Sequence, residues 1–178
     1  MKKSIKTADA CLAALFTAVI AVISQISVIM PTGVPITFQT FVVALCGFVL
    51  GTKLSLASVL TYILAGAVGL PVFSGFRGGV QHIFGATGGF IIGFLALALF
   101  CGIAGTRSSF MPRLFIGIIG LIICNFIGVV QFAAVSSVGL IEAFLTASVP
   151  FLIKDIILFT VAVMFSYKIK SLIIKIKK

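Results

Sequence analysis

The chain is short of acidic residues, with three among its 178 residues against 13 lysines and arginines. Charged residues of both signs make up 9% of it, well below the roughly 25% that is typical of soluble domains. Hydrophobic residues make up 61%, and the mean hydropathy is +1.36. This balance excludes an ordinary water-soluble domain and predicts an integral membrane protein.

The chain also lacks the usual sequence signatures of catalysis. No G-x-x-x-x-G-K-[ST] phosphate loop is present, so we do not expect the chain itself to hydrolyse ATP. The sequence shows no nucleophile–base pair and no cluster with metal-ligand spacing. Its four cysteines stand singly in apolar runs, at Cys11, Cys46, Cys101 and Cys124. We therefore predict a protein that is not an enzyme and needs no metal or cofactor of its own.

Long apolar segments dominate what is present. They predict an all-α membrane protein in which residues 1–178 form a single domain. The six expected transmembrane helices cover 10–30, 38–51, 54–70, 87–104, 114–135 and 147–167.

The positions of the basic residues predict the orientation of these helices. With both termini in the cytoplasm, eleven of the thirteen lysines and arginines fall on the cytoplasmic side, as the positive-inside rule requires. The two exceptions are Arg77, in an outer loop, and Lys154, within a span. This distribution favours a multi-pass cell-membrane protein beside anionic lipid over a nucleic-acid-binding protein. The cytoplasmic set is Lys2, Lys3, Lys6, Lys53, Arg107, Arg113, Lys168, Lys170, Lys175, Lys177 and Lys178.

Asp155 is the most unusual residue, because it lies inside the apolar stretch 149–165. An ionisable side chain at this depth costs roughly 2.5 to 3.5 kcal/mol on insertion scales, so it indicates a functional site with a partner group. Its neighbour Lys154 is the basic residue deepest in a predicted span. The pair suggests that the protein holds a small polar molecule within the membrane.

The first expected helix carries a stripe of small residues, Ala10, Ala14, Ala18 and Ala21. At about 100° per residue these four fall on one narrow face, which another helix can approach closely. Two interpretations remain open from the residues alone. The stripe packs inside the bundle, or it is an external face on which a partner membrane protein docks.

Two outer segments carry further candidates for ligand binding. In 31–40, Phe38 and Gln39 stand at the head of the short second helix. The segment 69–89 contains seven glycines, three phenylalanines including Phe73, and the basic residue Arg77. Glycine-rich backbone such as that around Gly79 permits close approach to a ligand, and irregular backbone at membrane depth lines a cavity or is covered by protein. We expect this segment to form a lid.

Four motifs of the chain are distinctive: Val34-Pro-Ile-Thr-Phe-Gln-Thr40, Gly69-Leu-Pro-Val-Phe73, Gly85-Ala-Thr-Gly-Gly-Phe-Ile-Ile-Gly-Phe94 and Pro150-Phe-Leu-Ile-Lys-Asp155. In residue types, order and spacing they resemble the BioY family, the biotin-binding S components of energy-coupling factor (ECF) transporters.

The resemblance implies a six-helix S-component bundle with an outward-facing biotin pocket. It also implies docking through the alanine stripe to a transmembrane coupling subunit that is driven by two ATPase subunits. Vitamin uptake would then be the function, and an S component for another vitamin or small heterocycle is the alternative. The residues expected to bind substrate are Phe38, Gln39, Phe73, Arg77, Gly79, Lys154 and Asp155.

Two positions depart from the family pattern. Ala86 stands where the family often has proline, and Leu158 stands where many members have a lysine one turn after the aspartate. Lys154 is the candidate for that missing positive charge, although adjacent residues on a helix point about 100° apart.

Overall fold

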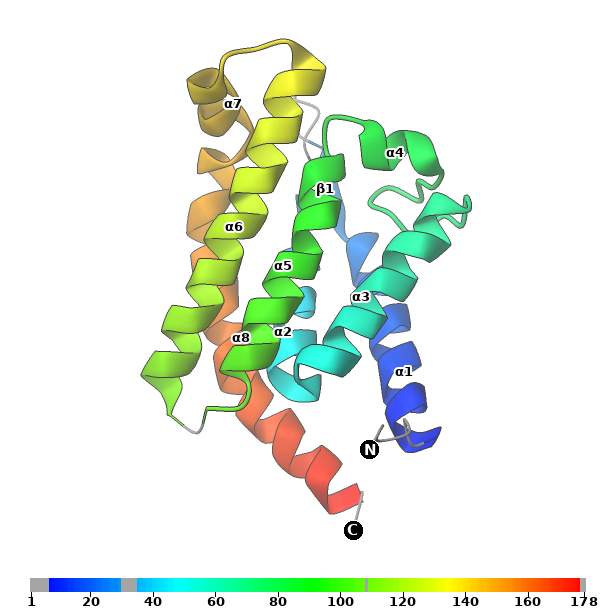
Figure 1. Cartoon of the computed structure of the whole chain (residues 1–178), viewed down its shortest axis with the longest axis vertical. Coiled ribbons are helices and arrows are strands. Elements are labelled where there is room, and N and C mark those ends of the chain that lie inside the picture. The colour runs from blue at the N-terminus through cyan, green and yellow to red at the C-terminus, as the bar shows by residue number, and fades with distance from the viewer. Residues whose placement is uncertain (1–6, 30–34, 108, 177–178) are drawn as a thin grey trace.

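The structure is a computed structural model that describes residues 7–29, 35–107 and 109–176. It is a bundle of helices with one small hairpin of strands at one end (Figure 1). Its elements are α1 (Thr7–Ser24), β1 (Ser27–Ile29), β2 (Pro35–Thr37), α2 (Gln39–Leu50), α3 (Thr52–Ala67), α4 (Val80–Phe84), α5 (Gly88–Ala104), α6 (Phe110–Ser136), α7 (Leu140–Ala147) and α8 (Val149–Ile176).

A helix lies in each of the six ranges expected from hydropathy. Within the described residues, α1, α6 and α8 are long and apolar enough to cross a membrane. The other three, α2, α3 and α5, are shorter apolar helices of 10–17 residues. The chain is therefore a helical membrane protein with at least these candidate spans.

Three elements differ from the sequence-based expectation. The first helix ends at Ser24, and β1 then pairs antiparallel with β2, so the range 10–30 was too long. The segment 69–89, expected to be irregular, contains the five-residue helix α4. A separate short helix, α7, precedes α8. Hydropathy misses such elements because it measures apolar character and not where the chain bends.

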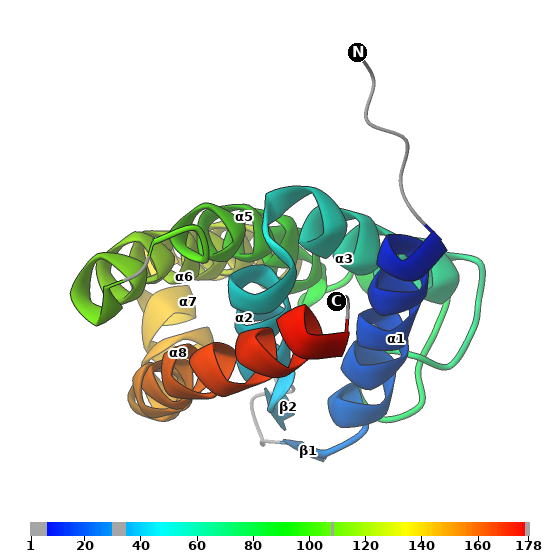
Figure 2. The same cartoon turned by 90° about the horizontal axis from the view of Figure 1, so that it is seen from below.

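The α2 helix is the centre of the bundle. Nine of its twelve residues are buried, and it packs against α1, α3, α5 and α8. Seen along the bundle, α2 lies between these helices (Figure 2). Since a helix buried on all sides needs no polar face, α2 is apolar throughout except at its start, where Gln39 and Thr40 stand.

Glycines allow α5 and α6 to pack at close range. A Cβ atom added to Gly89 would lie 2.5 Å from the Ile127 carbonyl oxygen and 3.0 Å from the Gly128 Cα atom. On the same face, a Cβ on Gly93 would lie 2.8 Å from the Cys124 carbonyl oxygen. Small residues at a helix interface are the usual means of association in a membrane, where hydrophobic burial gives no drive.

The two ends of the bundle differ in charge. The start of α1, the end of α8 and the α2–α3 and α5–α6 connections lie at one end, and β1, α4 and α7 lie at the other (Figure 1). Lys53 and Arg107 are exposed at the first end.

Arg113, which was counted among the cytoplasmic flanking residues, is buried there instead. It is 3% exposed, donates a 2.9 Å hydrogen bond to Ser166 Oγ, and stacks 3.9 Å from the Tyr167 ring centroid. It ties the start of α6 to α8, a role that charge counting does not reveal.

Candidate ligand-binding site

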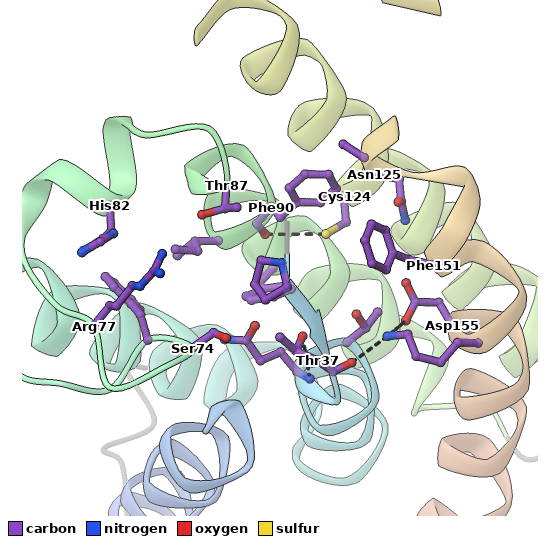
Figure 3. A pocket seen from close by; sticks show the side chains of 18 residues that line it. Thr37, Ser74, Arg77, His82, Thr87, Phe90, Cys124, Asn125, Phe151 and Asp155 are labelled. Atoms are coloured by element: carbon purple, nitrogen blue, oxygen red, sulfur yellow. Dashed lines mark hydrogen bonds and ion pairs between the residues drawn. The ribbon is translucent and has the colours of Figure 1, made fainter. Parts of the chain in front are cut away.

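A cavity lies at the end of the bundle that carries the hairpin, α4 and α7. Its empty volume, including the open space at its mouth, is about 840 Å³. Side chains from α2, α5, α6 and α8 line it together with parts of the two outer segments (Figure 3). The lining residues are Pro35, Thr37, Gln39, Thr40, Phe73, Ser74, Arg77, His82, Thr87, Phe90, Ile91, Phe94, Cys124, Asn125, Ala147, Phe151, Lys154 and Asp155.

The acidic side of the cavity is formed by Asp155 on α8. Its side chain is 7% exposed, and the Lys154 ammonium lies 2.7 Å from its Oδ1 atom. The same ammonium donates a 2.6 Å hydrogen bond to the Thr37 carbonyl oxygen of β2. Oδ1 is buried and receives no well-directed hydrogen bond from the described residues, so it keeps acceptor capacity. A buried carboxylate in this state can accept a hydrogen bond from a ligand N–H group.

Gln39 and Tyr62 form a second polar group at the head of α2. The Gln39 side-chain amide donates a 2.7 Å hydrogen bond to the Tyr62 hydroxyl, and the tyrosine is fully buried. This bond fixes the orientation of an amide that lines the cavity. A glutamine in this position can exchange hydrogen bonds with a polar heterocycle.

A basic group stands on the opposite side of the cavity from Asp155. Figure 3 shows Arg77 and His82 on one side, with Asn125 and Asp155 on the other. Arg77 is exposed, and its guanidinium makes no hydrogen bond or ion pair with any described residue. A free guanidinium at the edge of a cavity is suited to a ligand carboxylate, which it can bind in bidentate fashion.

The wall between the two polar sides is largely aromatic. Phe90, Ile91 and Phe94 come from one face of α5, Phe151 comes from α8, and Phe73 comes from the glycine-rich segment. Phe73 is 3% exposed and packs edge-to-face on Tyr62, with ring centroids 5.5 Å apart. Such a wall accommodates an apolar ring or chain between polar end groups.

Sequence reasoning placed five of its seven binding candidates on this cavity, namely Gln39, Phe73, Arg77, Lys154 and Asp155. The other two, Phe38 and Gly79, are not among the residues that line the cavity. Phe38 is 40% exposed at the start of α2 and does not line the cavity. Gly79 precedes α4 and donates its N–H to the Gly66 carbonyl oxygen at 2.7 Å, so its place is in the fold of the loop.

Asn125 is a lining residue that sequence reasoning missed. Its amide donates to the Leu121 carbonyl oxygen at 3.0 Å and accepts from Ser148 Oγ at 3.0 Å. An asparagine in the middle of the long apolar helix α6 was a visible signal, because polar groups in a span mark functional positions. The aromatic wall had no such signal, since phenylalanine is common throughout the chain.

Three of the four alanines in the α1 stripe face away from the bundle. Ala10, Ala14 and Ala18 are exposed, whereas Ala21 is partly buried against the core. The buried face of the helix carries Phe16, Ile20 and Ser24 instead. Of the two interpretations left open by the sequence, internal packing is therefore wrong for the first three alanines.

Comparison with known proteins agrees with this architecture. A sequence profile described as the BioY family matches residues 1–175. A probable biotin transporter BioY of Pyrococcus horikoshii is 38% identical over 166 residues, which cover 93% of this chain and 98% of that protein. The biotin transporter BioY of Thermotoga maritima is 40% identical over 163 residues, which cover 90% and 94%.

A solved structure has a similar fold. It is the S-component for biotin from an ECF-type ABC transporter, with a TM-score of 0.85 and 24% sequence identity over 96% of this chain and 95% of that one. The fold and the cavity thus define a helical membrane protein with the S-component architecture. The chain belongs to the BioY family.

Proposed function

We propose that the protein is the substrate-binding membrane subunit of a biotin uptake transporter. It captures biotin in the cavity and delivers it through an ATP-driven coupling module. The observation that carries this proposal is the arrangement of the cavity, with Asp155 and Arg77 on opposite sides of an aromatic wall. Membership of a family whose relatives are named biotin transporters supports it.

Biotin has a complementary arrangement of groups. Its ureido ring offers two N–H donors and one carbonyl acceptor, and we place it beside Asp155. The Asp155 carboxylate accepts from one ureido N–H, and the Lys154 ammonium donates to the ureido oxygen. Gln39 and Asn125 lie on the same cavity and supply further amide groups.

The rest of the ligand extends toward Arg77. The apolar thiophane ring and valeryl chain pass along Phe90, Phe94 and Phe151, and the ligand carboxylate pairs with the Arg77 guanidinium. The ligand carboxylate thus meets the Arg77 cation at one end, and the ureido ring meets the Asp155 carboxylate and the Lys154 ammonium at the other. No bond is made or broken, so the protein acts as a binding subunit and not as an enzyme.

The arrangement of the bundle supports a direction of uptake. We infer six membrane-spanning helices with both termini in the cytoplasm, because Lys53 and Arg107 lie at the end where α1 begins and α8 ends. The cavity is then at the outer end, with the segment 69–89 as its lid. The exposed alanines Ala10, Ala14 and Ala18 lie on a lipid-facing side of α1, where they can meet a helix of a coupling subunit. Two ATPase subunits would act through that subunit.

An S component for another vitamin or small heterocycle is the second candidate. The aromatic wall and the paired polar sides accept other molecules that combine a hydrogen-bonding ring with a carboxylate. Direct identification of the ligand separates the two. We expect the protein, purified in mild detergent from cells grown with biotin, to retain biotin detectable by mass spectrometry. Retention of a different small molecule, with no binding of added biotin in calorimetry, would contradict the proposal.

A further inference from the structure

The segment 72–77 forms a tight hairpin that carries two cavity residues. Phe73 N–H donates to the Arg77 carbonyl oxygen at 2.9 Å, and Arg77 N–H donates to the Phe73 carbonyl oxygen at 3.3 Å. Both side chains line the cavity. The position of this hairpin therefore decides where the aromatic ring and the guanidinium stand relative to a ligand.

The end of α1 holds this hairpin through side-chain hydrogen bonds. Gln25 Nε2 donates to the Val72 carbonyl oxygen at 3.1 Å, and Gln25 Oε1 accepts from the Phe76 N–H at 2.7 Å. Ser24 Oγ also donates to the Val72 carbonyl oxygen. A single glutamine thus contacts the hairpin both at its base and at its tip.

The backbone at the tip adopts a conformation that needs such support. Phe76 has φ +57°, in the left-handed region that bulky residues rarely adopt, and it follows Gly75 at φ +73°. Strained backbone persists where the surroundings impose it. The Phe76 side chain is 72% exposed and gives little packing, whereas its N–H is held by Gln25.

The base of the hairpin is seated on α3. A Cβ added to Gly66 would lie 2.1 Å from the Phe73 ring, so the ring occupies the space that this glycine leaves. Packing against Gly66 fixes the position of Phe73, whereas the Arg77 side chain is exposed. On the other side of Arg77, the Gly79 N–H donates to the Gly66 carbonyl oxygen of α3 at 2.7 Å. The two Gln25 hydrogen bonds, here called the clamp, are what join the tip of the hairpin at Phe76 to α1.

We propose that Gln25 is a positioning residue for the substrate site, which holds the 72–77 hairpin over the cavity and so sets how long the ligand stays bound. This inference rests on the proposed function in one respect, because it takes biotin as the ligand. The restraint of the hairpin by Gln25 does not depend on which ligand binds. Gln25 does not line the cavity, so its effect passes through Phe73 and Arg77. Since the clamp restrains a bound ligand and does not attract a free one, it acts on the dissociation rate.

The experiment compares Gln25→Met with a matched control, Gln81→Met. Gln81 lies in the same outer segment, but its amide bonds only within that segment, to the Gly78 carbonyl oxygen at 3.0 Å. Dissociation of radiolabelled biotin from the purified subunit is followed after addition of excess unlabelled biotin. We expect Gln25→Met to release biotin about 2- to 10-fold faster, the range for the net loss of one neutral hydrogen bond, with little change in association. The control should match the wild-type chain.

A second measurement needs no ligand. Arg77 is exposed and Arg113 is buried, so trypsin can cut after the first while the fold protects the second. Gln25→Met should be cut faster after Arg77 but not after Arg113, and Gln25→Glu, which keeps an acceptor for the Phe76 N–H, should lie closer to wild type. If Gln25→Met is also cut after Arg113, the variant has opened the fold as a whole, and the rate of cleavage of Gln25→Glu after Arg77 then tests the clamp. A rate close to wild type supports it, and a rate as fast as that of Gln25→Met contradicts it.

The outcomes separate this inference from the proposed function. A wild-type chain that binds no biotin refutes the proposed function, and the trypsin measurement then still tests the clamp. If biotin binds but Gln25→Met shows wild-type dissociation and wild-type cleavage after Arg77, Gln25 has no positioning role. A lower melting temperature without a change in either rate likewise means that Gln25 supports the fold and does not position the hairpin.

Discussion

The Lys154 ammonium contacts two groups of the site, because it lies 2.7 Å from Asp155 Oδ1 on α8 and 2.6 Å from the Thr37 carbonyl oxygen on β2. Adjacent helix residues point about 100° apart, which argued against Lys154 supplying the positive charge that is missing at Leu158. The long, flexible lysine side chain overcomes that angle. Its ammonium therefore stands beside the aspartate and secures β2 to α8.

The Asp155 carboxylate is expected to contact the ligand directly. A charge-assisted hydrogen bond contributes about 1.5 to 3 kcal/mol, so Asp155→Asn should weaken biotin binding roughly 10- to 150-fold. Desthiobiotin, which keeps the ureido ring, should lose a similar factor. Calorimetry on the purified variant measures both affinities. If Asp155→Asn lowers the melting temperature of the ligand-free protein but leaves both affinities intact, the aspartate serves only to hold the bundle.

Lys154→Met tests the ammonium separately from the carboxylate. The variant removes the contact to Asp155 and the hydrogen bond to β2 while keeping a flexible apolar chain. We expect weaker biotin binding and a lower melting temperature, because the buried Asp155 loses its counter-charge. The double variant Lys154→Met/Asp155→Asn should be more stable than Lys154→Met, since it no longer buries an unpaired charge. A double variant less stable than either single one would contradict the pairing.

The exposed alanines of α1 are expected to dock a coupling subunit. Ala14→Leu should abolish biotin uptake by cells that contain the complete transporter, while binding to the isolated subunit stays near wild type. The larger side chain holds the partner helix away without reaching the cavity. Val19→Leu is the matched control, because Val19 is also on the outside of α1 but about 140° from Ala14. Equal losses of binding and uptake in Ala14→Leu would mean that the residue supports the fold and not docking.

The orientation in the membrane can be measured with single cysteines. Gly139 lies between α6 and α7, and a Cβ added there meets nothing within 4 Å, so Gly139→Cys should fold normally. Thr106→Cys is exposed at the opposite end of the bundle. In a chain that also carries Cys11→Ser, an impermeant maleimide should label Gly139→Cys on intact cells and Thr106→Cys only after the cells are opened. The reverse pattern would overturn the proposed orientation.

The α5–α6 interface should not tolerate a single added methyl group. Gly89→Ala places Cβ 2.5 Å from the Ile127 carbonyl oxygen, which cannot move without shifting the helix. Overpacking of this kind costs about 1 to 3 kcal/mol, so the melting temperature in detergent should fall. Gly139→Ala is the control and should leave it unchanged. An unchanged melting temperature in Gly89→Ala would show that the two helices are not packed this closely.

The membrane class, the positions of the six main helices and the choice of Asp155 as a binding candidate follow from the sequence alone. Hydropathy reports the cost of exposing polar groups to lipid, and that cost is a local property of each segment. The resemblance in the outer motifs likewise needed only residue types in order, and it predicted the family that the comparisons show. Gln39, Arg77, Lys154 and Asp155 could be named because polar residues are conspicuous in so apolar a chain.

Only the tertiary structure decided which side chains meet. The cavity joins residues from α2, α5, α6 and α8, and its aromatic wall carries no local signal that distinguishes it from lipid-facing phenylalanines. The structure turned the α1 alanines outward, buried Arg113 among α8 side chains, and brought Gln25 onto the 72–77 hairpin, about 50 residues away in the sequence. Contacts between distant segments depend on how whole helices pack, and packing is a property of the complete bundle rather than of any stretch of it.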